Sequence, residues 1–178
     1  MAFVRVVVDH MKLEYSGLFD SKELFKHIAS FANNNSLQKR DTKSFEQDLP
    51  EGKCIETESD YWRKVTDYAR TTYRIRILIH NLKKVEAMLD KKKKNLSSGK
   101  VVIWFDAFLE QDYEHRWEDV PMLLFIRTLF DKWLYHGYTE RFEQRITHLT
   151  NHWYDQTEKF FNFYRHYKTV SKIPHFAH

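Results

Sequence analysis

Cysteine, glycine and proline are all scarce in this sequence of 178 residues, and each scarcity excludes a class of structure. Cys54 is the only cysteine, so no intramolecular disulfide can form and a reducing compartment is expected. Four glycines and three prolines leave few positions for irregular backbone, which argues against an active site built from loops. The sequence therefore predicts regular secondary structure that folds without disulfide support.

Long apolar runs are also missing. The longest, Met122 to Ile126, is far too short to cross a bilayer. The N-terminal residues Met1 to Arg5 lack the continuous apolar segment of a signal peptide. We therefore expect a soluble protein with no transmembrane segment, located in the cytoplasm or incorporated in a virion assembled there.

No group of residues carries a recognisable catalytic or cofactor-binding pattern. Three carboxylates alternate between Glu110 and Glu114, but hard cations need oxygen ligands gathered from a turn or from several elements. His148 and His152 have the i, i+4 spacing that suits zinc, yet no third ligand is evident. Cys54 has no histidine beside it in the sequence to activate its thiol. The sequence thus predicts no enzyme, no metal site and no cofactor.

Period-2 alternation of apolar and polar residues dominates the first two-thirds of the chain, which is typical of half-buried strands. The apolar parity switches between Val4 and Val6 on one side and Leu13 and Tyr15 on the other, which predicts either a β-bulge or a strand that begins late, near residue 9. Strands are predicted over residues 3–15, 53–62, 67–80, 85–89 and 100–114, with residues 37–48 as an edge strand or a loop. Short turns between consecutive strands indicate an antiparallel meander.

Helical periodicity appears in three places. Asp20 followed by Glu23 resembles a capping box, and predicts a helix that ends near residue 33. Pro121 stands where it would open a buried helix, which Gly137 would end. A long helix is predicted from Thr139 to about residue 168, long enough to overhang the sheet.

We therefore predict a single domain over residues 1–178, of the α+β class. Its antiparallel meander sheet is accompanied by one N-terminal helix and two C-terminal helices, of which the last is long. Residues 1–117 would hold the sheet and its first helix, residues 118–168 the helical portion, and residues 169–178 a tail.

A net charge of +4 conceals opposite charges on predicted strands. The outward parity of residues 67–80 is basic, whereas the same parity of residues 53–62 and 100–114 is acidic. One interpretation is that these charges set the strand register and keep this face soluble. The other is that they surround aromatic residues that anchor a protein interface. The candidate interface residues, two of them on the long helix, are Trp62, Tyr68, Arg70, Arg74, Arg76, Trp104, Phe108, Trp153 and Tyr164.

The compensation of these arginines by carboxylates weakens a nucleic-acid interpretation, because phosphate binding needs an uncompensated basic surface. One basic run remains for that alternative. It lies at a predicted hairpin tip and comprises Lys91, Lys92, Lys93, Lys94 and Lys100.

Two resemblances bear on fold and context. The order of strand, helix, antiparallel strands and long C-terminal helix resembles helix-grip proteins of the START and polyketide-cyclase type, which implies an apolar ligand between a curved sheet and the last helix. The runs at residues 62–68, 109–117 and 125–132 are similar to uncharacterised small proteins of archaeal lineages and their mobile elements. This second resemblance implies a virus- or element-encoded context and no activity.

The leading hypothesis is a non-enzymatic structural or assembly subunit of a larger protein complex, acting through protein partners or self-association, with a virion-type component as the context that the second resemblance implies. The first alternative is a helix-grip binding protein for an apolar small molecule. The second is a nucleic-acid-associated accessory protein that uses the lysine run.

Overall fold

The computed structural model describes residues 3–66, 69–89, 92–111, 135–166 and 168–169 of the chain. Its elements, in chain order, are β1 (Phe3–Phe19), α1 (Ser21–Asn34), β2 (Gln38–Leu49), β3 (Gly52–Lys64), β4 (Ala69–Leu89), β5 (Lys92–Gln111), α3 (Tyr135–Tyr164) and the short β6 (Lys168–Thr169). The five long strands lie in the antiparallel order β1-β5-β4-β3-β2, and β6 pairs with β4. The predicted α+β class and antiparallel sheet are confirmed.

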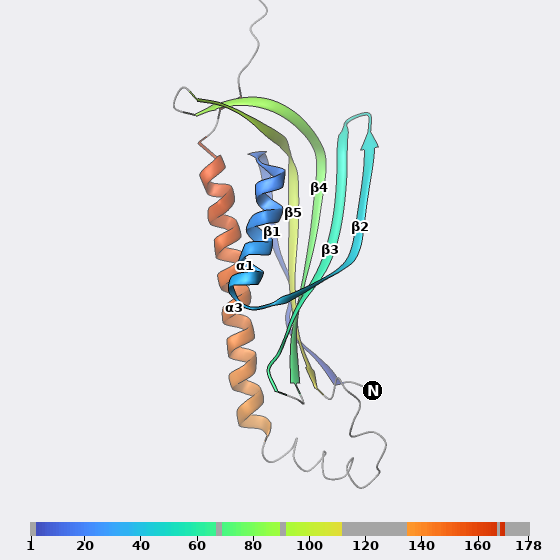
Figure 1. Cartoon of the computed structure of the whole chain (residues 1–178), viewed down its shortest axis with the longest axis vertical. Coiled ribbons are helices and arrows are strands. Elements are labelled where there is room, and N and C mark those ends of the chain that lie inside the picture. Colours follow the sequence, from blue (N-terminus) through green and yellow to red (C-terminus); the bar gives the residue numbers. More distant parts are fainter. Residues whose placement is uncertain (1–2, 67–68, 90–91, 112–134, 167, 170–178) are drawn as a thin grey trace, which may run out of the picture.

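The sheet is long and curved, and both described helices lie against one of its faces (Figure 1). Strands β2 to β5 form the expected meander, whereas β1 pairs with β5 at the far edge. Residues 37–48, predicted as an edge strand or a loop, form the edge strand β2, and all twelve of its residues are exposed. The β2–β3 hairpin extends away from the helices (Figure 1), which explains why β2 can be polar on both faces.

Strand β1 is irregular close to the position at which its apolar parity switches. The pairing of β1 with β5 shifts register between Val6 and Val8 and again between Val8 and Met11. His10, inside the second irregularity, has a φ of 50°, a left-handed conformation that is uncommon for a residue other than glycine. Together the two shifts restore the original parity, so Val6 and Leu13 point to opposite faces of the sheet. The apolar pattern switches because Val6 is 54% exposed, whereas Leu13 faces the core.

Strand β4 corrects the predicted order of strands. The sequence analysis placed a turn at Asn81 and a separate strand over residues 85–89; instead one strand of 21 residues continues through this point. Asn81 has a φ of 55° and sits in a register shift between His80 and Lys83, so the local irregularity is a bulge. Gly52 packs closely here, because a Cβ atom on it would lie 2.8 Å from the carbonyl carbon of Asn81. As a result β4 pairs directly with β5.

Helix α1 begins as its sequence predicts. The Asp20 carboxylate accepts hydrogen bonds from the backbone N–H groups of Lys22 and Glu23, at 3.0 and 3.2 Å. Glu23 does not complete a reciprocal capping box, because its carboxylate instead accepts hydrogen bonds from Tyr164 and Lys94. The N-terminus of α1 is thereby tied to the C-terminal end of α3.

The described part of the chain contains one C-terminal helix, α3, of 30 residues. Gly137 lies inside α3, in its first turn, which corrects its predicted role as the end of a preceding helix. The predicted helix from Pro121 to residue 134 lies outside the described residues, as does the tail beyond Thr169. Neither of the described helices is long and apolar enough to cross a membrane.

Trp153 is the centre of the core between α3 and the sheet. Its indole is fully buried and stacks on Phe31 of α1 with ring centroids 4.9 Å apart. The ring also meets Tyr61 of β3 edge-on at 5.1 Å, and Phe105 of β5 at 6.3 Å. Its Nε1 atom has no hydrogen-bond partner among the described residues, so packing alone holds the side chain. Trp153 thus joins both helices to the sheet.

We expect Trp153→Ala to lower the free energy of unfolding by about 3–5 kcal/mol, because it leaves a large cavity at this junction. Phe163→Ala is the matched control on the same helix, since Phe163 is 56% exposed and should cost less than about 0.5 kcal/mol. Urea unfolding followed by circular dichroism measures both. Equal losses for the two variants would contradict this view of the core.

Burial of Tyr61 also predicts alkaline sensitivity. Loss of hydration raises the pKa of its phenol from 10.0 to about 12, so the native state keeps a proton that the unfolded chain releases above pH 10. The stability from this group is complete below pH 10 and is lost as the pH rises to about 12. Tyr61→Phe should therefore show a shallower decline of unfolding free energy over that range than the wild type; identical slopes would refute the assignment.

Candidate functional site

The sheet face opposite the helices, here called the outer sheet face, gathers most of the predicted interface residues. Because side chains alternate along a strand, residues between those that contact Trp153 point to this second face. It is formed mainly by Val4 and Val6 of β1, Glu58, Asp60 and Trp62 of β3, Arg70, Arg74 and Arg76 of β4, and Trp104, Asp106, Phe108 and Glu110 of β5.

Each arginine of β4 is paired with a carboxylate on a neighbouring strand. Arg74 donates from Nε to Asp60 at 2.8 Å and from a terminal nitrogen at 3.3 Å, a bidentate contact with β3. Arg76 donates to Asp106 of β5 at 2.9 Å. The hydrogen bond from Arg74 to Asp60 raises the pKa of the guanidinium, which therefore stays charged at any ordinary pH. The basic strand thus lies between two acidic strands.

Each of the same arginines also lies over an aromatic ring. The guanidinium carbons of Arg70, Arg74 and Arg76 lie 5.4, 5.6 and 5.6 Å from the ring centroids of a partner. Those partners are, in the same order, Trp62, Phe108 and Trp104. Cation–π contact and an ion pair together hold each arginine and each ring in one orientation.

The aromatic rings of this face are only partly covered by the arginines. Trp62, Trp104 and Phe108 are intermediate in burial, whereas Val4 and Val6 at the adjacent edge are 52% and 54% exposed. Val6 pairs with Phe108, so these apolar groups form one continuous patch beside the charged ladder.

Two of the predicted interface residues are placed in the core, and a third falls outside the part of the chain that the structure describes. Trp153 and Tyr164 are 0% and 1% exposed, and belong to the core rather than to a surface that a partner could reach. Their helical periodicity is the same for a core stripe as for an interface stripe, which is why the sequence did not separate the two. Tyr68 lies outside the described residues.

One member of the lysine run, Lys94, contacts acidic side chains of another element. Lys94 lies 3.1 Å from Glu23 and 3.7 Å from Asp20, so its charge is compensated by the start of α1. Lys93 and Lys100 are exposed, whereas Lys91 and the side chain of Lys92 lie outside the described part of the chain. A phosphate group that approached Lys94 would therefore also meet Asp20 and Glu23.

Two groupings of titratable residues arise only through strand pairing. The Sγ of Cys54 lies 3.7 Å from Nδ1 of His80 on the adjacent strand, a histidine partner that Cys54 lacks in the linear sequence. No other group orients His80 among the described residues, so the third member of a catalytic triad is not in place there. Asp9, His10 and Asp106 bring one ligand atom each within 4.8 Å of one another.

The second grouping could hold a cation only in competition with Arg76. Asp106 already accepts hydrogen bonds from the His10 backbone N–H at 2.7 Å and from Arg76. Its carboxylate is thus neutralised by an internal cation, and the bulge residues Asp9 and His10 close over the end of that pair. We interpret this cluster as part of the ladder on the outer sheet face.

Among the described residues, those that the sequence analysis considered for metals are not gathered into a site. Glu110 accepts hydrogen bonds from Arg70 and Thr72, and the carboxylates beyond it lie outside the described residues. His148 and His152 are both exposed on α3, where the His152 ring contacts Phe31 at 5.5 Å.

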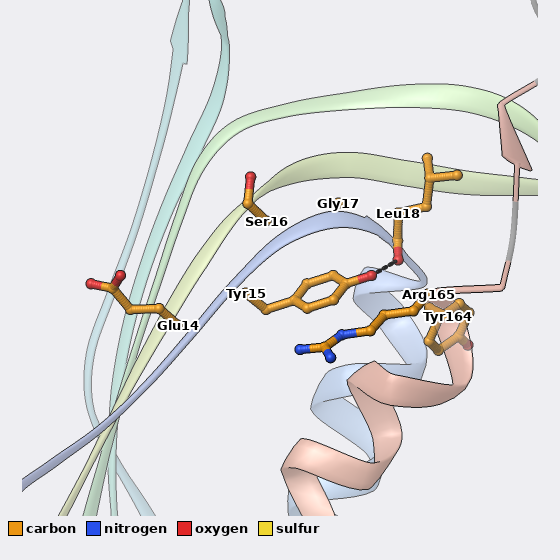
Figure 2. A pocket seen from close by; sticks show the side chains of 7 residues that line it. All are labelled: Glu14, Tyr15, Ser16, Gly17, Leu18, Tyr164 and Arg165. Carbon is orange, nitrogen blue, oxygen red and sulfur yellow. Dashed lines mark hydrogen bonds between the residues drawn. The ribbon is translucent and has the colours of Figure 1, made fainter.

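A shallow hollow of about 490 Å³ lies where β1 meets the C-terminal end of α3. Figure 2 shows the Tyr15 hydroxyl turned toward the Leu18 carbonyl, to which it donates at 2.8 Å, and the Arg165 side chain extending beneath the tyrosine ring. Glu14 lies at its other side, so the charges around the hollow are mixed. Tyr15 itself stacks on Phe161 at 4.5 Å and serves the core.

No family model, curated protein or solved structure matches this chain.

The ladder predicts a specific coupling between Arg76 and Asp106. Arg76→Met leaves a carboxylate that is only 5% exposed without its cation, whereas Arg76→Met combined with Asp106→Asn removes both charges. We expect the double variant to be more stable than the single one by about 1–3 kcal/mol in urea unfolding. A double variant that is less stable than Arg76→Met would show that the pair does not act as a unit.

Proposed function

We propose that this protein is a non-enzymatic assembly subunit that associates with a second copy of itself through the outer sheet face. The observation that carries the proposal is the row of half-buried aromatic rings, each held by an arginine, on a face that the described helices leave uncovered (Figure 1). Tryptophan and arginine are the residue types most enriched among the strongly contributing positions of protein interfaces.

The rigidity of this face favours binding. A side chain that is already fixed by an ion pair and a cation–π contact loses little rotamer freedom when a partner covers it. Trp104, Phe108 and the exposed Val6 would form the apolar centre, and the ion pairs around Arg74 a polar rim.

Charge arrangement favours a second copy as the partner. The basic residues of β4 are flanked on both sides by acidic residues, Asp60 on β3 and Asp106 on β5. Two such faces related by a twofold axis can place the basic row of one against an acidic row of the other, with an offset of one strand. A uniformly basic face would repel its own copy.

The two alternative functions have less support. A helix-grip protein needs room for an apolar ligand between sheet and last helix, and that space is occupied by Trp153 and its ring contacts with Phe31, Tyr61 and Phe105. A nucleic-acid-associated role would rest on the lysine run, in which the charge of Lys94 is compensated.

Light scattering after size-exclusion chromatography, over a range of protein concentrations, tests the proposal. We expect the wild type to form dimers, and Trp104→Ala combined with Phe108→Ala to shift the dissociation constant at least about a hundredfold toward monomer. Phe163→Ala, which removes an exposed ring from the opposite side of the molecule, should leave the dimer unchanged.

Measurements at high salt separate the apolar contribution to dimer stability from the electrostatic one. Because the apolar centre is not screened, dimers should persist at high salt. A wild-type protein that is strictly monomeric at every concentration and salt level would refute self-association through this face.

A further inference from the structure

A second hollow, here called the basic hollow, lies on the helix side of the sheet and has a different chemistry. It has a volume of about 490 Å³ and forms where the end of β3, the residue after α1 and the N-terminal half of α3 meet. Its lining consists of Asn35, Arg63, Arg141, Gln144, Arg145, His148 and Leu149. Three of these seven residues are arginines, and none is acidic.

The arginines of the basic hollow differ from those of the outer sheet face because none has a carboxylate partner among the described residues. Arg63 donates only to the backbone carbonyl of Asn35, at 3.1 Å. Arg141 and Arg145 are exposed and stand at i and i+4 on α3, a like-charge spacing that by itself destabilises a helix slightly. The repulsion between Arg141 and Arg145 is thus not offset by an ion pair with a described residue.

The acidic side chains of α3 do not line the basic hollow. The nearby carboxylates of this helix, Glu140 and Glu143, line an adjoining hollow toward β1, which shares Gln144 with the basic hollow. There Glu143 pairs with Arg5 at 2.8 Å. Neither carboxylate lines the basic hollow itself.

We infer that the basic hollow binds a small phosphate-bearing ligand with at least two negative charges. Guanidinium groups bind phosphate oxygens through paired hydrogen bonds, and three of them converging on one space suit a multiply charged group. Gln144 and His148 line the same space and add polar contacts, and Leu149 supplies an apolar surface. The volume is in the range that accommodates small-molecule ligands.

This site is independent of the proposed assembly surface. Arg63 points to the helix side of β3, whereas its neighbour Trp62 belongs to the outer sheet face. Ligand binding and self-association therefore engage opposite sides of the sheet, and either one can fail in experiment without the other.

Isothermal titration calorimetry of the full chain, in a phosphate-free buffer at low salt, tests the inference. Pyrophosphate is the first probe, adenosine diphosphate the second, and citrate a control of comparable charge without phosphorus. We expect saturable 1:1 binding of pyrophosphate and weaker binding of citrate. Tighter binding of adenosine diphosphate than of pyrophosphate would indicate a nucleotide, and the reverse order a free phosphate compound.

Substitutions then locate the site. Arg141→Gln and Arg145→Gln should each raise the dissociation constant for pyrophosphate about tenfold, and the two together about a hundredfold. Lys159→Gln removes one charge from an exposed position on the same helix and should change it less than about twofold. Both arginines are exposed, so thermal unfolding should show all the variants folded.

Three outcomes would overturn the inference. The first is no saturable binding of either phosphate probe, and the second is equal weakening by Lys159→Gln, which would indicate net charge alone. The third is preferential binding of a single-stranded oligonucleotide with a steep salt dependence, which would indicate a nucleic-acid backbone rather than a small ligand.

Discussion

The burial of Trp153 against the concave face of the sheet is the contact on which the rest of the structure depends. One indole joins α1, through Phe31, to β3 and β5, through Tyr61 and Phe105. Successive side chains of a strand point to opposite faces of the sheet. Since Tyr61 and Phe105 face Trp153, the residues next to them in the same strands face away from it. The core therefore also determines which arginines and aromatic rings are presented to solvent.

On that opposite face the arginines of β4 act as rigid supports rather than as a source of free charge. Each pairs with a carboxylate and lies over an aromatic ring, so its own charge is compensated while the ring remains partly exposed. Exposed ion pairs contribute little to stability by themselves. The arrangement is better suited to holding a surface in one conformation, which is why we propose this face as the site of association.

The distribution of charge divides the molecule into two kinds of surface. Positive groups of the outer sheet face, and Lys94 near α1, are matched by carboxylates. Arg141 and Arg145 are not matched, and the acidic residues of their own helix do not line the basic hollow. The net charge of +4 does not reveal this difference, because it does not depend on which charged side chains have partners.

Local patterns in the sequence determined most of the strands, helix α1 and the outward parity of Trp104 and Phe108, because these depend on alternation and capping between near neighbours. Tertiary structure alone decided the rest. It continued β4 through Asn81, placed Trp153 in the core, and brought Arg63 to the arginines of α3. The reason is physical: periodicity specifies which face a residue occupies, whereas the element that packs on that face comes from distant parts of the chain.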